Sequence, residues 1–107
     1  MAKRKASQIN LVPAQPAPAA ADFALEQNYP NPFNPATSIP YTLERRAHIR
    51  LTVHDAAGRM LATLVDGMRD AGRHTVQFDA ASFASGVYYY RLESNGVRMS
   101  RKMVLLR

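Results

Sequence analysis

The 107-residue sequence predicts an all-β fold, an immunoglobulin-like antiparallel β-sandwich of about seven strands. Short runs of alternating apolar and polar residues recur at intervals of roughly 8 to 14 residues, with turn-forming residues between them and no convincing helical period. The chain also ends in two β-rich runs joined by Asn95-Gly96, a dipeptide that readily takes the positive φ angles of a two-residue type I′ turn. This rhythm is typical of two sheets joined by Greek-key links.

Composition limits the number of domains and the available chemistry. With 47% hydrophobic residues in 107, the chain is long enough for one small domain. It contains no cysteine, which excludes a disulfide framework and a thiolate metal site. No apolar run approaches the ~20 residues of a membrane-spanning helix, so we expect no membrane insertion.

The net charge of +6 raises the possibility of a nucleic-acid partner. Lys3, Arg4 and Lys5 lie near the start of the chain, and many other basic residues alternate outward along predicted strands. The run Tyr88-Tyr89-Tyr90 cannot form one base-stacking platform, because consecutive strand residues point to opposite faces. We therefore expect solvated charge and no nucleic-acid partner.

Residues 1–22 are expected to be a disordered linker, basic at first and then rich in Ala and Pro, because its prolines disfavour helix. Met1–Lys5 resembles the basic start of a signal peptide. Polar residues interrupt the segment that follows, so we expect no export signal at this end. The domain is expected to span residues 23–107.

An Asn/Pro-rich loop is predicted near the start of the domain. Each proline fixes its own φ and restrains the preceding residue, and asparagine side chains bond nearby backbone groups, so the loop should be stiff without being regular. Tyr29 and Phe33 are expected to anchor it on the sandwich. A Ca²⁺ site is disfavoured because no carboxylates interleave with the asparagines. The loop consists of Asn28, Tyr29, Pro30, Asn31, Pro32, Phe33, Asn34 and Pro35.

Two strands are predicted after this loop. Thr37–Leu43 alternates, and Pro40 places it at a sheet edge or at the start of a strand, because proline donates no backbone hydrogen bond. His48–Asp55 alternates most regularly and is the clearest strand in the chain. The side chains expected to face the core are Ile39, Tyr41, Leu43, Ile49, Leu51 and Val53. Those expected to face solvent from the second strand are Arg50, Thr52 and His54.

The segment Asp55–Arg59 is predicted to be a turn, with Gly58 at a positive φ. Met60–Val65 then reads as a more continuously apolar strand, ended by a second turn at Asp66-Gly67. A helical turn within Met60–Met68, or at Phe83, is the minor alternative.

A connector leads from Met68 to Gly72, and His74–Asp79 is predicted to be a strand with Val76 and Phe78 facing the core. Residues 80–85 then lead into the closing hairpin.

The closing hairpin spans Ser85–Arg107. In the tight-turn register Leu92 faces Met99, Tyr88 faces Met103, and Glu93 faces Arg98, and each opposed pair shares a face. The apolar face is predicted to consist of Tyr88, Tyr90, Leu92, Met99, Met103 and Leu105. The opposite, polar face is predicted to consist of Tyr89, Arg91, Glu93, Arg98, Ser100 and Lys102.

Two features of the last strand depart from this pattern. Arg101 falls opposite Tyr90 on the inner face, so either its stem snorkels toward solvent or a bulge shifts the register. After Lys102 the residues are apolar on both faces. Such a strand at the very end of the chain is expected to offer a partner exposed backbone edges together with side chains.

No catalytic constellation is visible. His48, His54 and His74 are expected to be solvated surface residues without metal-like spacing, and Ser85 lacks the glycine that precedes the serine of a nucleophile elbow. We expect a non-enzymatic domain without cofactor or metal. The residues assigned to structural turns are Asp55, Gly58, Gly86, Asn95 and Gly96.

Five blocks of the sequence, in order, resemble the C-terminal sorting domain of the type IX secretion system, type A. The resemblance covers Phe23–Arg107, and its most specific parts are NYPNPFNP and the closing KMVLLR. The blocks are LEQNYPNPFNPATSIPYTL, LTVHDAAGRMLATLVDG, AGRHTVQFD, SGVYYYRL and RKMVLLR. A weaker resemblance links the domain to the immunoglobulin-like domain of flagellar hook-capping proteins.

The resemblance implies a sorting signal that directs N-terminally attached cargo of Bacteroidetes-like bacteria through an outer-membrane translocon, so that the cargo is secreted or displayed on the cell surface. It also implies cleavage before Phe23 by a surface peptidase or sortase. The implied recognition segment is Lys102, Met103, Val104, Leu105, Leu106 and Arg107. The alternative function is an immunoglobulin-like binding or structural module, adhesive or flagellar-cap-like, without a sorting role.

Overall fold

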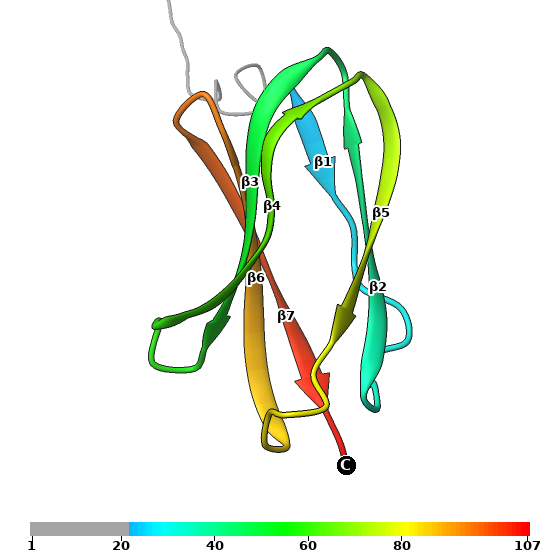
Figure 1. Ribbon diagram of the computed structural model, residues 1–107, viewed down its shortest axis with the longest axis vertical. Coiled ribbons are helices and arrows are strands. Elements are labelled where there is room, and N and C mark those ends of the chain that lie inside the picture. The colour runs from blue at the N-terminus through cyan, green and yellow to red at the C-terminus, as the bar shows by residue number, and fades with distance from the viewer. Residues whose placement is uncertain (1–21) are drawn as a thin grey trace, which may run out of the picture.

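The computed structural model describes residues 22–107, which form an all-β sandwich of seven strands in two antiparallel sheets, as predicted (Figure 1). One sheet has the order β1-β2-β5 and the other β4-β3-β6-β7. The linker predicted for residues 1–22 lies, apart from Asp22, outside the described residues. The strands are β1 (Phe23–Leu25), β2 (Ala36–Leu43), β3 (Ala47–Asp55), β4 (Met60–Arg69), β5 (Gly72–Asp79), β6 (Gly86–Ser94) and β7 (Val97–Leu105).

The connections cross between the sheets three times, from β2 to β3, from β4 to β5 and from β5 to β6. As a result β3 pairs with β6, although two strands separate them in the sequence. This is the Greek-key arrangement of immunoglobulin-like sandwiches, with β4 paired to β3. It places β7, the last strand, at one edge of the four-stranded sheet.

The core lies between the sheets and consists of the side chains that the alternation directs inward. Burying each large apolar side chain stabilises the fold by about 1.5–3 kcal/mol. The predicted inward residues that are at most 9% exposed are Ile39, Tyr41, Leu43, Ile49, Leu51, Val53, Phe78, Tyr88, Tyr90, Leu92, Met103 and Leu105. The closing hairpin also has the predicted register, from Gly86 opposite Leu105 to Ser94 opposite Val97.

The prediction for β4 was wrong in its second half. Asp66-Gly67 is not a turn, and the strand continues to Arg69 with Asp66 opposite Arg50 and Gly67 opposite Ile49. Two register shifts in the β3–β4 ladder absorb the extra residues of the more apolar run. The helical alternative for this run is therefore wrong as well, and Phe83 lies in a turn.

Pro40 lies in the interior of β2, the central strand of its sheet, and not at an edge or a strand start as predicted. Its carbonyl accepts the Glu26 N–H at 3.1 Å, just beyond the end of β1. Because the N–H and C=O of a residue in an antiparallel ladder point to the same neighbour, a proline here leaves the Glu26 carbonyl free. The Tyr90 hydroxyl donates to that carbonyl at 2.6 Å instead.

β1 was not predicted, because only three residues form it and the loop after it dominates the sequence pattern. It pairs with the end of β2, with Phe23 opposite Leu43 and Leu25 opposite Tyr41. The side chains of Phe23 and Leu25 are at most 5% exposed, whereas Ala24 is exposed, so β1 closes the core beside β7 with its two large residues.

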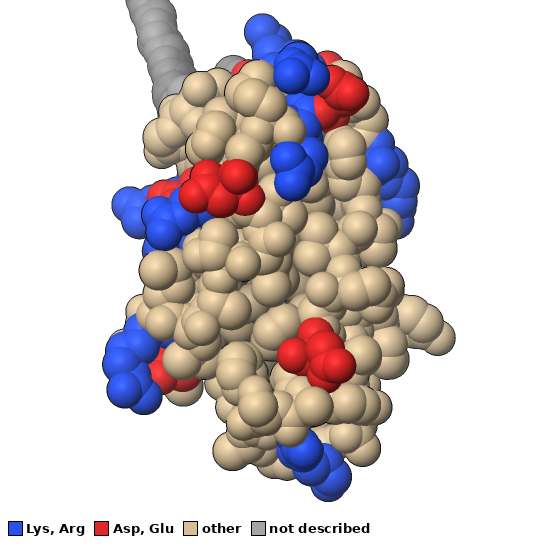
Figure 2. Space-filling view, viewed as in Figure 1, with Lys and Arg blue, Asp and Glu red and all other residues tan. Residues whose placement is uncertain are grey.

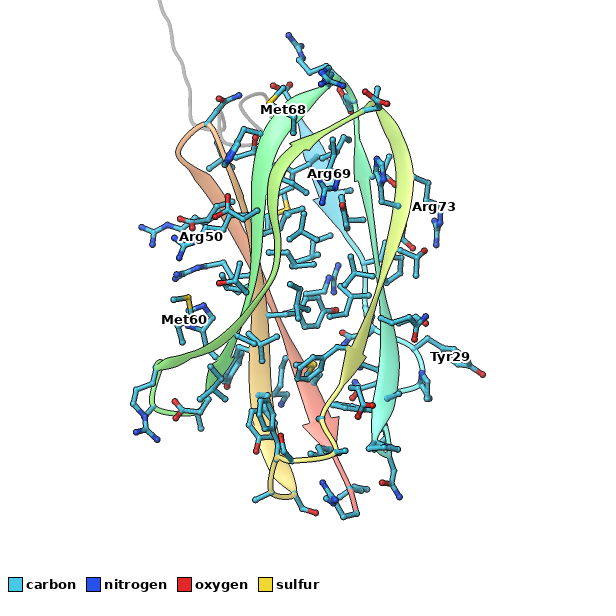
Figure 3. All side chains as sticks on the ribbon, in the orientation of Figure 1. Tyr29, Arg50, Met60, Met68, Arg69 and Arg73 are labelled. Carbon is cyan, nitrogen blue, oxygen red and sulfur yellow. The ribbon has the colours of Figure 1, made fainter. Side chains whose placement is uncertain are left out.

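Figure 2 shows acidic and basic side chains interspersed and mostly near the margin of this face, so the positive charge does not gather into one patch on it. Figure 3 shows Arg69, at the end of β4, directed between the two sheets. No helix within residues 22–107 is long and apolar enough to cross a membrane.

Candidate functional site

The segment implied as the recognition signal, Lys102–Arg107, is called here the terminal segment. It ends beside the loop that joins β5 to β6, at the lower end of the molecule (Figure 1). Its side chains alternate, with Met103 and Leu105 fully buried and Val104 partly buried. Leu106 is 55% exposed, and Lys102 and Arg107 are exposed as well. The terminal segment therefore seals the core with one row of side chains and presents the other row to solvent.

The backbone edge of the terminal segment is covered, contrary to the expectation of an exposed edge. The Phe33 N–H donates to the Val104 carbonyl at 2.9 Å, and the Leu106 N–H donates to the Phe33 carbonyl at 3.0 Å, which forms a parallel bridge. The Asn31 side chain accepts the Val104 N–H at 2.9 Å. These bonds occupy the groups that an added strand would need.

The last residue is held by the loop at 80–85. The Arg107 guanidinium donates to the carbonyls of Ala80 at 3.1 Å and Phe83 at 2.6 Å, and the Arg107 N–H donates to the Ser85 hydroxyl at 3.0 Å. Ser85 therefore has a structural role, which the sequence pattern did not indicate.

The Asn/Pro loop, Asn28–Pro35, is fixed to the sandwich by a buried polar cluster. The Asn28 side chain donates to the Thr37 hydroxyl at 3.0 Å, and both side chains bond the Pro30 carbonyl. Asn28 and Thr37 are each 2% exposed. Peptide bonds preceding Pro30, Pro32 and Pro35 are cis. Because the side chains of the cluster satisfy one another, the loop can be buried at this point.

Tyr90 joins this cluster to β6. Its hydroxyl accepts the Asn28 N–H at 2.8 Å and donates to the Glu26 carbonyl at 2.6 Å. Burial raises the pKa of Tyr90, and the Asn28 N–H and the nearby charge of Arg101 partly offset that rise. The hydroxyl therefore stays protonated and tied to the backbone on both sides of the loop's start.

The two aromatic residues of the loop differ in burial. Phe33 is 2% exposed and packs against Phe78, with ring centroids 6.2 Å apart, as expected of an anchor. Tyr29 was expected to be an anchor as well, but it is 79% exposed and projects away from the sandwich (Figure 3). The isolated bridge between Tyr29 and Ser38 turns this side chain to the outer face. Sequence alone gave no signal that separates the two residues.

Arg101 resolves the ambiguity in the last strand. The β6–β7 ladder runs without a register shift and keeps Arg101 opposite Tyr90, so the bulge alternative is wrong. The guanidinium of Arg101 reaches the Leu25 carbonyl at 2.6 Å, at the exposed rim where β1 meets β7. Nearby, the Gln27 side chain donates to the Lys102 carbonyl at 2.8 Å and covers a further part of the β7 edge.

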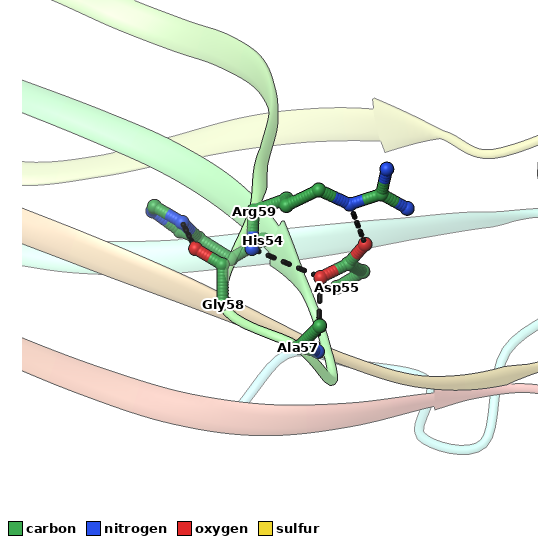
Figure 4. A network of polar contacts seen from close by, with 5 residues as sticks. All are labelled: His54, Asp55, Ala57, Gly58 and Arg59. Carbon is green, nitrogen blue, oxygen red and sulfur yellow. Dashed lines mark hydrogen bonds and ion pairs between the residues drawn. The ribbon is translucent and has the colours of Figure 1, made fainter.

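The residues assigned to turns occupy turns or strand starts. Gly58, Asn95 and Gly96 have φ angles of 90°, 53° and 79°, values that favour glycine or asparagine. Gly86 is the first residue of β6. Asp55 shapes the turn after β3 by accepting the N–H groups of Ala57 and Arg59 at 3.0 and 2.9 Å and the Arg59 side chain at 2.9 Å (Figure 4).

Stability should depend on the ionisation of Asp55. The hydrogen bond from the Arg59 N–H contributes most to lowering the pKa of this carboxyl below its usual value. A lowered folded-state pKa stabilises the fold above the unfolded-state value and loses that contribution as the pH falls through the folded-state value. We expect Asp55→Asn to lose less stability than the unmodified chain between about pH 6 and pH 3, in urea unfolding at each pH. Equal acid sensitivity of the two proteins would exclude this contribution.

The three histidines are not alike. His48 is largely solvated, as expected, and lies 3.2 Å from Asp66. His54 was expected to face solvent but is 8% exposed, because Met60 and Tyr89 flank it on both neighbouring strands. Its ring contacts the Thr52 hydroxyl at 2.9 Å and the Gly58 carbonyl at 3.3 Å.

Two further outward assignments were wrong. Thr52 is 1% exposed, because β3 is an inner strand of its sheet, with Arg91 of β6 opposite Thr52 on one side and Thr63 of β4 on the other. His74 is partly buried and stacks on Tyr41 with ring centroids 5.1 Å apart, because it shares the inner face with Val76 and Phe78. Within residues 22–107, no three histidine or acidic side chains come together as a metal site.

Comparison with known proteins gives a family match and similarity to solved structures. The family described as "Secretion system C-terminal sorting domain" matches residues 27–106. No curated protein matches.

Among solved structures, the chain is similar to PorZ, described as an essential bacterial surface component of the type IX secretion system of Porphyromonas gingivalis. The two are 20% identical with a TM-score of 0.56, and the similarity covers 78% of this chain and 12% of that chain. At this identity the similarity shows the fold, and this chain spans a small part of the length of PorZ.

Proposed function

Because the chain belongs to the C-terminal sorting domains of the type IX secretion system, we propose that its signal is read from the outward side chains of a folded terminal segment. Sorting domains of this family carry attached cargo to the cell surface or the medium across the outer membrane. The residues proposed to be read are Lys102, Val104 and Leu106, since the Arg107 guanidinium is already bonded to the carbonyls of Ala80 and Phe83.

One observation carries this proposal: the backbone groups along the edge of the terminal segment are hydrogen-bonded, whereas the side chains on its outer face are at least partly exposed. Its edge is bonded to Asn31 and Phe33, so strand addition would first have to displace the Asn/Pro loop. Leu106, in contrast, is 55% exposed although it is a large apolar residue at the end of a strand. An exposed leucine in the same outward row as Lys102 and Val104 favours recognition by side-chain contact.

The same proposal assigns three partners: the translocon, a surface peptidase or sortase, and the attached cargo. The translocon would contact the terminal segment, and a surface peptidase or sortase would cut the chain before Phe23, where the first strand of the domain begins. The cargo would be attached N-terminally. The terminal segment lies at the opposite end of the molecule from the β6–β7 turn (Figure 1). A translocon that binds the terminal segment would therefore contact the domain at one end only.

We also propose that the domain has no enzymatic activity. The side chains that could carry chemistry are engaged in structural contacts, since His54 bonds Thr52 and Gly58, and Asp55 bonds the turn that follows it. The Ser85 hydroxyl, which contacts the terminal segment, accepts the Arg107 N–H.

The test grafts residues 22–107 onto a periplasmic reporter in a host with the type IX translocon. We expect the reporter to reach the medium or the cell surface, and to stay in the periplasm when the translocon is absent or the domain is omitted. Retention of the grafted reporter in the complete host would contradict the sorting role. Deleting Lys102–Arg107 is a poor control, because it also removes Met103 and Leu105 from the core.

A further inference from the structure

The outer face of the β6–β7 hairpin carries a cation without a partner above a pocket. The face consists of the residues that alternate away from the core, and register places Arg91 opposite Ser100, Tyr89 opposite Lys102 and Val87 opposite Val104. A pocket of about 310 Å³ lies on this face, bordered by Tyr89, Arg91, Ser100 and His54.

Arg91 is the one lysine or arginine among the described residues that line this pocket. Within the part of the chain that the structure describes, it forms no ion pair, and its Nε is buried without a hydrogen-bond partner. A guanidinium presents its donors in a planar fork that fits a carboxylate, and a buried donor without a partner is unfavourable. Because the unpaired guanidinium borders the pocket, a ligand carboxylate can supply the missing acceptor there.

The acidic residues near Arg91 are already engaged. Glu93, next on the same face, pairs with Arg98 at 3.7 Å, and Asp55, at the rim of the pocket, pairs with Arg59 at 2.9 Å. Lys102 has no ion pair within residues 22–107 and adds a second cation beside Tyr89. The unmatched charge of this face is positive, so the complementary partner is negative.

The pocket continues into an apolar surface that reaches the terminal segment. Val87 and Tyr89 are each 38% exposed on β6, and Val104 lies beside Val87 on β7. Leu106 follows on the same face, at 55% exposure. A surface with a central cation and an apolar border fits an extended peptide that places an acidic side chain and apolar side chains on one face.

We propose that this surface, defined by Val87, Tyr89, Arg91, Ser100, Lys102, Val104 and Leu106, docks an acidic and apolar extended segment of a protein of the export machinery. The carboxylate binds Arg91 with help from the Ser100 hydroxyl, and the apolar side chains pack on Tyr89 and Val104. This inference rests on the proposed function and extends the recognition surface from the terminal segment to β6.

The binding test uses the full chain, labelled with ¹⁵N, and the peptide acetyl-Leu-Thr-Glu-Thr-Leu-amide, whose Leu and Glu side chains share one face when extended. We expect saturable NMR shifts at the Arg91 side chain, Tyr89, Ser100 and Val104. The same peptide with Gln in place of Glu should bind about tenfold more weakly. Absence of saturable shifts, or equal binding by both peptides, would overturn the proposal. Equal shifts with inorganic phosphate would also overturn it, because the site would then be a general anion site.

Variants of the two arginines provide the control. Arg91→Gln should weaken binding of the Glu peptide about tenfold or more, whereas Arg98→Gln, on the same face but paired with Glu93, should leave it unchanged. If Arg91→Gln does not fold, Arg91→Lys decides the question, since lysine keeps the charge but loses the fork. Unchanged binding in Arg91→Lys would overturn the assigned geometry.

The secretion assay separates this inference from the proposed function. A grafted domain carrying Arg91→Gln should reach the medium at least about fivefold less efficiently than one carrying Arg98→Gln. Equal secretion of the two variants would overturn the docking surface while leaving the sorting role intact. Retention of the unmodified graft would instead contradict the sorting role, whatever the peptide binds.

Discussion

Replacing Phe33 by alanine is expected to lower the free energy of unfolding by about 3–5 kcal/mol. The Phe33 ring is 2% exposed and packs against Phe78, so its removal leaves a cavity between the two sheets. The backbone of Phe33 also holds Val104 and Leu106, and a loop without its anchor should release both bonds. Urea unfolding followed by far-ultraviolet circular dichroism measures the change.

Tyr29→Ala is the matched control, because it removes an aromatic side chain from the same loop at a position that is 79% exposed. Its unfolding free energy should stay within about 0.5 kcal/mol of the unmodified chain. Equal losses of stability in the two variants would mean that Phe33 does not anchor the loop. The claim that the loop covers the edge of β7 would then lose its main evidence.

Replacing Leu106 by aspartate should reduce secretion of a grafted reporter about tenfold or more without changing the melting temperature. The Leu106 side chain is 55% exposed, and its contribution to the fold is the backbone bond to Phe33, which the substitution keeps. The new charge removes the exposed apolar contact at the end of the terminal segment. The measurement is the ratio of reporter in the medium to reporter in the periplasm.

Leu61→Asp is the control for this variant, since Leu61 is 38% exposed on β4, the opposite edge strand of the same sheet. It should secrete normally. Normal secretion of Leu106→Asp would contradict recognition through outward side chains. Equal loss in both variants would show that secretion responds to surface charge in general.

The hairpin of β6 and β7 could be predicted in detail because local rules determine it. Asn95-Gly96 specifies a two-residue turn, and the turn specifies every pair of the ladder down to Gly86 opposite Leu105. The alternation then assigns each side chain to a face. The same reasoning identified the inner faces of β2 and β3, where apolar residues recur at every second position.

The features that were missed depend on distant partners. Asp66-Gly67 has the composition of a turn, yet pairing with β3 keeps it extended. Pro40 looks like an edge residue, and it is accommodated in a central strand because Tyr90, far away in the sequence, bonds the Glu26 carbonyl that it leaves free. Covering of the terminal segment by the Asn/Pro loop is likewise a contact between the two ends of the domain, for which no local pattern exists.

The resemblance identified the family and implied that the terminal segment is its signal, and the structure adds how that segment is presented. An exposed edge was expected from two-sided apolar character, but the second apolar face is explained by contacts at the end of the strand. Val104 lies beside Val87, and Leu106 extends beyond the ladder. Apolar side chains on both faces of an edge strand therefore did not imply a free backbone.

The central claim is that the Asn/Pro loop covers the backbone edge of the terminal segment, so that only its outward side chains are available to a partner. Hydrogen exchange of the Val104 and Leu106 amides in the unmodified chain tests it most directly, with Phe33→Ala as the reference for an uncovered edge. The account predicts that both amides exchange as slowly as the paired amides of the β6–β7 ladder, and faster in Phe33→Ala. Exchange of both amides at the rate of unprotected groups in the unmodified chain would contradict it.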